Sequence, residues 1–451
     1  MSGSHHKLER KLGLFPVTNI VIANIIGAGI FTTTGYLMGF LGNPLLMLAL
    51  WIIGGIIALC GALAFGELGA SFPEAGGEYV FISKLFNPML GFLSGWLSLI
   101  VGFSAPIAAS AIGFSNYFTW AFPKLQQWLM LNEVLSSDMF NQLLAILIIV
   151  IFSFVHSRGI VLGARVQNTL TVLKILLVAG LIIAGFLVGE GSLQNLHKGN
   201  PVNFGFDGWK AIGLSLIFIM FAYSGWNSAT YIGSEIKTPR KVIPRSLLIS
   251  TIIVTILYVL LNLFFVYAVP VGHMRNEPEI GGLAAGFAFG STAETVISLL
   301  ISFALFSSLS AFIILGPRVY YKMAQDGYFF KSIAQVHPLR KVPSNAILLQ
   351  AAIAIILVLS GTFEQILTYM GFSLGIFPIL AVAGVFKLRM QNKSRLKLPG
   401  YPFVHFVFIG SGVAMLVLAY LDRPVESSIA VLTALSGIPV YFWFKKKSLG
   451  H

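Results

Sequence analysis

The sequence feature that most constrains the fold is a series of apolar segments, each long enough to cross a lipid bilayer as a helix. About 20 apolar residues, at a rise of 1.5 Å per residue, span a hydrocarbon core of about 30 Å. We count twelve such segments among the 451 residues. They cover 14–39, 44–68, 88–116, 139–156, 164–188, 210–233, 246–269, 293–316, 344–361, 364–386, 403–420 and 428–444. The pattern predicts an all-α polytopic membrane protein with 12 transmembrane helices.

The composition agrees with a membrane protein and leaves no room for a soluble module. Hydrophobic residues make up 57% of the chain and charged residues only 10%, which is typical of helical membrane proteins. No stretch between the apolar segments is long enough to fold separately, so we expect a single membrane domain over residues 1–451. Cys60 is the only cysteine, which excludes an intramolecular disulfide and a C-x-x-C metal or redox site. No cofactor is predicted.

The basic residues indicate the orientation of the chain in the membrane. The formal net charge is +13, but these residues are scattered through short loops, which favours membrane topology over a nucleic-acid partner. Most of the 29 Lys and Arg residues fall on one side of the predicted spans. The few on the other side are Lys124, Lys198, Lys210, Arg275 and Arg423. We therefore expect a multi-pass protein of the plasma (inner) membrane with both termini cytoplasmic.

The first apolar segment carries two glycines, Gly27 and Gly29, at the depth where a helix would cross the middle of the bilayer. Each glycine weakens a helix interior by about 1 kcal/mol relative to alanine. Unpaired backbone groups cost several kcal/mol in hydrocarbon, so an opened helix survives only where it lines a cavity or meets a ligand. Broken helices near the midplane are typical of secondary transporters. The alternative is a packing face of small residues.

The sixth apolar segment carries a similar interruption, Phe221-Ala222-Tyr223-Ser224-Gly225-Trp226-Asn227. Five spans separate the starts of the two interrupted segments, so the two halves would enter the membrane from opposite sides. This is the geometry of a five-plus-five inverted repeat with broken helices 1 and 6. The first repeat would cover about 11–188 and the second about 205–386, with extra helices at about 403–444.

The segments between the spans carry further signals. A polar turn at 71–79 follows the second span, and Pro239 and Pro244 are expected to stop any continuous helix after the sixth. The external segments 117–138 and 270–292 are long enough for short surface helices.

Four motifs, in this order along the chain, resemble those of a known family. They are Gly27-Ala28-Gly29-Ile30-Phe31, Pro73-Glu74-Ala75-Gly76-Gly77, the interruption at 221–227, and Glu235 with Pro239, Pro244 and Arg245. Together they resemble the amino acid–polyamine–organocation superfamily, and within it the L-type amino acid transporter branch with its bacterial serine/threonine and alanine/serine/cysteine exchangers. The resemblance implies a five-plus-five inverted-repeat fold and sodium-independent exchange of small neutral L-amino acids.

A zwitterionic amino acid presents one carboxylate and one ammonium group, and broken helices suit both. A helix N-terminus offers free N–H groups and a positive dipole end, and a helix C-terminus offers free carbonyls. No charged side chain is then needed, and none is seen at either break. The resemblance implies that the amides of Ala28 and Gly29, beside Gly27, hold the carboxylate. It assigns the ammonium to the carbonyls of Ile25, Phe221, Ala222 and Ser224.

Three positions of this predicted site have a competing interpretation or depart from the family pattern. Phe221 is expected to close over the substrate, although ordinary packing is the usual role of a phenylalanine. Asn227 is expected to hydrogen-bond near the site, or else to satisfy the loosened backbone of its own span. Ala28 replaces the serine of some family members, so it offers no hydroxyl to the carboxylate.

Lys174 is a charged residue deep within an apolar segment, where a functional role is the default expectation. Snorkelling to the interface is the alternative, but Lys174 lies about ten residues from either end of its span. The resemblance implies that its ammonium takes the place of the sodium ion of sodium-coupled relatives, with no metal bound. It would join the first break, near Gly27, to the eighth span through Ser307 or Ser308, as a conformational coupling residue.

The sequence is also compatible with other functions. Proton-coupled symport is the second candidate, although the acids Glu67 and Glu235 lie near the ends of spans, where ion-paired gates are expected. Larger neutral or cationic amino acids are alternative substrates. An enzyme would need convergent catalytic groups and a channel would need rings of pore-lining residues, and neither pattern is present. The segment 117–138 has no cysteine, so we expect no disulfide-linked accessory subunit of the animal type.

Overall fold

The computed structural model describes residues 10–131, 136–158, 160–338, 340, 342–360 and 363–449, and every regular element among them is helical. The first part of the chain forms α1 (Leu14–Ile25), α2 (Ala28–Leu41), α3 (Pro44–Ser71), α4 (Glu78–Leu85), α5 (Pro88–Leu97), α6 (Ser104–Ala121), α7 (Pro123–Leu131), α8 (Ser137–Ser157) and α9 (Ile160–Leu187). The rest forms α10 (Phe206–Ala222), α11 (Pro239–Ala268), α12 (Val271–Met274), α13 (Ile280–Phe289), α14 (Ser291–Gln325), α15 (Ser344–Ser360), α16 (Phe363–Met390), α17 (Phe403–Asp422) and α18 (Pro424–Leu449).

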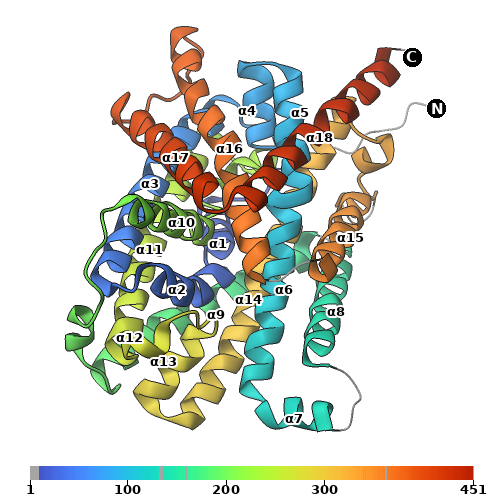
Figure 1. Cartoon of the computed structure of the whole chain (residues 1–451). Helices are drawn as coiled ribbons and strands as arrows, with labels where there is room; N and C mark the ends of the chain where they lie inside the picture. The colour runs from blue at the N-terminus through green and yellow to red at the C-terminus, as the bar shows by residue number, and fades with distance from the viewer. Residues whose placement is uncertain are drawn as a thin grey trace.

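Figure 1 shows most of the long helices running between two ends of the molecule. The short helices α7, α12 and α13 lie at one end, and α4 lies at the other. Sequence predicted short helices in the segments 117–138 and 270–292, and this prediction is confirmed within the described residues.

Ten stretches of helix in the described residues are long and apolar enough to cross a membrane. They correspond to ten of the twelve segments expected from sequence. The other two correspond to α10 and α15, which have 17 residues each and are shorter than a typical span of about 20 residues. The third stretch joins α5 to α6 through a π-helical turn at Ser98–Phe103.

The break in the first apolar segment is present where the glycines predicted it. The last helical bond of α1 runs from the Ile26 N–H to the Ile22 carbonyl, and Gly27 is extended, with φ −114° and ψ −157°. The next residue, Ala28, begins α2. The chain therefore exposes the peptide groups around Gly27 within an otherwise buried segment.

The sixth segment, expected over 210–233, is interrupted where the sequence predicted a break, but the part after the break is less helical than expected. Helix α10 ends at Ala222, and only two short 3₁₀ turns follow, at Ser228–Thr230 and Gly233–Glu235. We call the stretch 223–238 the post-α10 segment. Within this segment Gly225 takes φ +101°, a conformation that glycine adopts without strain.

The two prolines after this segment do not both stop a helix. Pro239 is the first residue of α11, where its missing N–H costs nothing. Pro244 lies within α11 near its start. The expectation that both prolines interrupt the chain is therefore wrong for Pro244.

Two buried ion pairs join long helices to other elements: one joins α3 to α16, and the other joins α14 to the post-α10 segment. Glu67 of α3 accepts hydrogen bonds from Arg389 Nη2 at 2.6 Å and Nε at 2.8 Å. Arg318 of α14 donates to Glu235 of the post-α10 segment at 3.0 Å. Sequence predicted that these two acids form ion pairs, and the prediction is confirmed, with partners on long helices rather than on loops.

Candidate functional site

The first break is held by a buried lysine from α9. Lys174 is only 1% exposed, and its Nζ donates to the carbonyls of Ala23, at 3.2 Å, and Ile26. Nζ also lies 2.8 Å from Ser308 Oγ of α14, and that hydroxyl donates to the Ile26 carbonyl at 2.7 Å. Snorkelling is therefore wrong: the ammonium points at the last carbonyls of α1, where the helix dipole is negative.

Of the two serines considered for this bridge, only Ser308 contacts the lysine. Ser307 belongs to a neighbouring polar cluster, in which Gln167 Nε2 donates to the Ser307 carbonyl at 3.1 Å and Thr171 Oγ1 lies 3.2 Å from Ser307 Oγ. Adjacent residues of a helix point in different directions, and the sequence alone does not distinguish them.

The two breaks pack directly against each other. A methyl group added at Gly29 would lie 2.7 Å from Ala222 Cα and 3.1 Å from Phe221 Cε1. A methyl group added at Gly225 would lie 2.3 Å from Asn24 Oδ1. Gly29 thus allows the start of α2 to contact the end of α10. Gly225 allows the post-α10 segment to contact α1.

A tyrosine that sequence reasoning missed joins the two breaks. Tyr258 of α11 is fully buried, and its hydroxyl lies 2.7 Å from the Ile25 carbonyl and 3.0 Å from the Ala222 carbonyl. A hydroxyl has one proton to donate, so Tyr258 hydrogen-bonds only one of the two carbonyls at any moment. The signal was present in the sequence, because a tyrosine in the middle of an apolar segment needs a partner for its hydroxyl.

The free N–H groups of the site belong to α2. Ala28 and Gly29 are its first two residues, and the first four N–H groups of a helix have no intrahelical partner. They lie at the positive end of the α2 dipole. An anionic group of a ligand is the natural partner for such a helix start.

A buried carboxyl lies beside the second break, where sequence predicted no charged side chain. Glu78, the first residue of α4, is 6% exposed. Its Oε1 accepts from Asn227 Nδ2 at 2.7 Å and from the Tyr231 hydroxyl at 3.2 Å. Sequence missed this acid because it lies about 150 positions from its partners, and only the folded chain brings them together.

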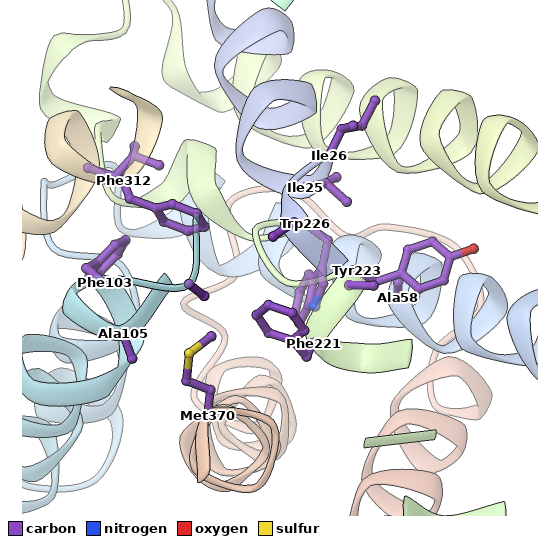
Figure 2. Packing of buried hydrophobic residues seen from close by; sticks show 14 of the residues in the cluster. Ile25, Ile26, Ala58, Phe103, Ala105, Phe221, Tyr223, Trp226, Phe312 and Met370 are labelled. Carbon is purple, nitrogen blue, oxygen red and sulfur yellow. The ribbon is translucent and has the colours of Figure 1, made fainter. Parts of the chain in front are cut away.

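A cavity of about 90 Å³ borders the second break. Ser224 and Asn227, both predicted site residues, line it together with Asn24 and Glu78. The apolar part of its wall includes Phe103, Phe312 and Trp226 (Figure 2). The other predicted residues lie at the two breaks rather than in the lining of this cavity: Ile25, Gly27, Ala28, Gly29, Phe221 and Ala222.

Phe221 is buried near the crossing of the two breaks, at 6% exposure, and Figure 2 shows it in the same buried hydrophobic cluster as Trp226. Asn227 does not bond its own loosened backbone through Nδ2, because that nitrogen donates to Glu78 and, at 3.2 Å, to Tyr231 Oη. The alternative that Asn227 only satisfies the loosened backbone of its own span therefore does not account for its side-chain bonds to Glu78 and Tyr231.

Comparisons with known proteins find relatives over nearly the whole chain. Residues 12–443 match the family model of amino acid permeases. The chain is 27% identical over 450 residues to the serine/threonine exchanger SteT of Bacillus subtilis, covering 98% of both proteins. It is 28% identical to large neutral amino acids transporter small subunit 2 of Homo sapiens, over 96% of this chain and 80% of that protein. It is 25% identical to Asc-type amino acid transporter 1 of Mus musculus, over 98% and 83%.

Proposed function

Because this chain belongs to the amino acid permease family, we propose that it exchanges small neutral L-amino acids across the plasma membrane, without sodium and by alternating access. The observation that carries the proposal is the crossing of two chain breaks deep inside the bundle, at Gly27 and after Ala222. Free N–H groups at the start of α2 and free carbonyl groups at the ends of α1 and α10 meet there. A dipolar solute needs this combination and no charged side chain of the protein.

The substrate carboxylate would bind the N–H groups of Ala28 and Gly29 at the start of α2. The ammonium would bind the carbonyls of Ile25, Phe221, Ala222 and Ser224. The Tyr258 hydroxyl already lies within hydrogen-bond distance of the Ile25 and Ala222 carbonyls. Each carbonyl oxygen has two lone pairs, so it can accept from the hydroxyl and from the substrate ammonium together. Phe221 would act as the gate over the bound molecule.

The size of the cavity supports small side chains. An apolar cavity of about 150 Å³ admits benzene, whereas the cavity beside Ser224 and Asn227 measures about 90 Å³. Side chains such as those of alanine, serine and threonine fit that space more readily than large aromatic ones. One relative is a serine/threonine exchanger, and this supports the same substrate class.

Lys174 supports independence from sodium. Its ammonium supplies a fixed positive charge at the carbonyl end of α1, next to the Ser308 hydroxyl. A sodium ion at this place would meet like-charge repulsion and would find its oxygen ligands already engaged. We propose that Lys174 couples the first break to α14 during the transport cycle.

We further propose twelve transmembrane helices in a single transport domain over residues 1–451, with α10 and the post-α10 segment as the sixth span and α15 as the ninth. The repeats would cover about 11–188 and 205–386, and α17 and α18 would form the extra pair at about 403–444. Both termini would be cytoplasmic. The sole cysteine, Cys60, is buried, which supports a chain without a disulfide-linked accessory subunit.

One observation favours a second candidate, proton-coupled symport. Glu78 is a carboxyl group that borders the cavity, and a carboxyl group in such a place is a typical proton carrier. The same carboxylate is an acceptor for the side chain of a cationic substrate. Both alternatives are tested by varying the gradient and the substrate panel.

The test is efflux of labelled serine from proteoliposomes that contain the purified protein. We expect efflux only when a small neutral L-amino acid is present outside, at the same rate with sodium or with potassium in the medium. Accumulation of serine driven by a pH gradient alone would favour symport. Trans-stimulation by lysine or phenylalanine, but not by serine or alanine, would contradict the proposed substrate class.

A further inference from the structure

The turn at 73–77 is fastened to the post-α10 segment by backbone contacts. The Gly76 N–H donates to the Tyr231 carbonyl at 3.1 Å, and the Ala75 N–H donates to Ser234 Oγ at 2.8 Å. Gly77, at φ +51°, lies close to the Tyr231 ring: an added methyl group would approach two ring carbons to 2.5 Å. The turn therefore fits this segment closely, and only glycine permits the fit.

The side chain that follows the turn makes the polar part of the same junction. Glu78 Oε1 accepts from both Asn227 and Tyr231. Within the described chain we find no hydrogen bond to Glu78 Oε2. Since Glu78 and Asn227 both line the cavity, this junction joins the substrate space to the turn.

No cation in the described residues neutralises this carboxyl. The charged groups on surrounding elements pair elsewhere: Arg318 with Glu235, Lys322 with Asp326 and Glu74, Lys84 with Glu74, and Arg389 with Glu67. Lys387 lies against the Phe86 ring. The nearby phenols are also engaged: Tyr79 donates to Asp326, and Tyr320 to the Ser98 carbonyl. Tyr231 itself is the neutral donor to Glu78.

Glu78 lies between two spans, Pro44–Ser71 and Pro88–Ala121. Burial raises the pKa of its carboxyl to about 7, against the opposing effect of the hydrogen bonds from Tyr231 and Asn227. The group is therefore neutral below this pH and ionised above it, within the physiological range.

We infer that Glu78 is a proton-binding site that fastens the 73–77 turn to the post-α10 segment and thereby makes the exchange rate depend on pH. The inference rests on the proposed exchange function. A carboxylate accepts hydrogen bonds about twice as strong as those of a neutral acceptor. The ionised form therefore holds Asn227 and Tyr231 tightly, and protonation loosens them. In the proposed cycle one bundle rocks against the other and the segment between α10 and α11 moves with it, so the protonated protein should cycle faster.

The test compares exchange by the wild type with exchange by Glu78→Gln from pH 5.5 to 8.5, on both sides of the proteoliposome membrane. The glutamine oxygen still accepts from Asn227 and Tyr231, but it carries no charge and does not titrate. Wild-type exchange should rise roughly threefold or more as the pH falls through about 7, because the junction loses its charge-assisted bonds. Glu78→Gln should hold the acid-limit rate at every pH.

A matched control lies on the same turn. Glu74 is partly exposed and pairs with Lys84 and Lys322, so Glu74→Gln should keep the wild-type pH profile. A wild-type profile in Glu78→Gln, or pH-independent exchange by the wild type, would overturn the inference.

Infrared difference spectra give a second measurement that does not need transport. Wild-type protein should show a protonated-carboxyl band that disappears with a midpoint near pH 7, and the Glu78→Asp variant should shift that midpoint. Absence of such a band overturns proton binding at Glu78, whether or not the protein transports. Absence of exchange for every amino acid, with the band present, would overturn the proposed function and leave proton binding supported.

Discussion

At the scale of single residues, Lys174 gives the sharpest test of the conformational role proposed for it. Lys174→Ala removes an ammonium that bonds the Ala23 and Ile26 carbonyls and Ser308. Hydrogen bonds to charged groups contribute about 1.5–3 kcal/mol each, so we expect a loss of exchange of about tenfold or more. The protein should still fold, because Ser308 continues to satisfy the Ile26 carbonyl.

The matched variant is Ser308→Ala, which removes one neutral partner and leaves the lysine on both carbonyls. We expect it to lose much less activity than Lys174→Ala. Size-exclusion profiles and thermal unfolding in detergent check the folding of both. Exchange at the wild-type rate in Lys174→Ala would contradict the role given to this residue.

At the scale of helices, the crossing of the breaks depends on a glycine at the start of α2. Gly29→Ala would place a methyl group 2.7 Å from Ala222 Cα, which is backbone and cannot simply rotate away. Overpacking of this kind costs about 1–3 kcal/mol, so we expect a lower unfolding temperature and a loss of exchange. Gly180→Ala is the control, because nothing lies within 4 Å of an added methyl group there. It should keep both properties.

The helices also show where sequence reasoning succeeds and where it fails. Gly27 and Gly29 located the first break correctly, because glycine weakens a helix wherever the chain later folds. The interruption at 221–227 was also predicted, but the irregular course that continues from it to α11 was not, since that course depends on docking against the turn at 73–77. Glu78 was missed for the same reason. The local backbone preference depends on neighbouring residues in the sequence, whereas the partners of a buried acid depend on tertiary contacts.

At the scale of the whole molecule, the proposed span count fixes which loops share a side of the membrane. Lys198, after α9, and Lys397, between α16 and α17, are both exposed. Under the proposed topology an odd number of spans separates them, so they must face opposite sides. The basic residues around Lys397 favour the cytoplasmic side for that loop, as the proposed topology expects.

The buried lone cysteine makes this testable, because Cys60→Ala gives a background without thiols. In that background a membrane-impermeant maleimide should label Lys198→Cys in intact cells, and Lys397→Cys only after the membrane is opened. Labelling of both from one side would contradict the odd number of spans, and with it the inverted repeat. The reverse pattern would keep the repeat but turn the molecule over, so that the 73–77 turn and Glu78 would face the external medium and respond to external pH.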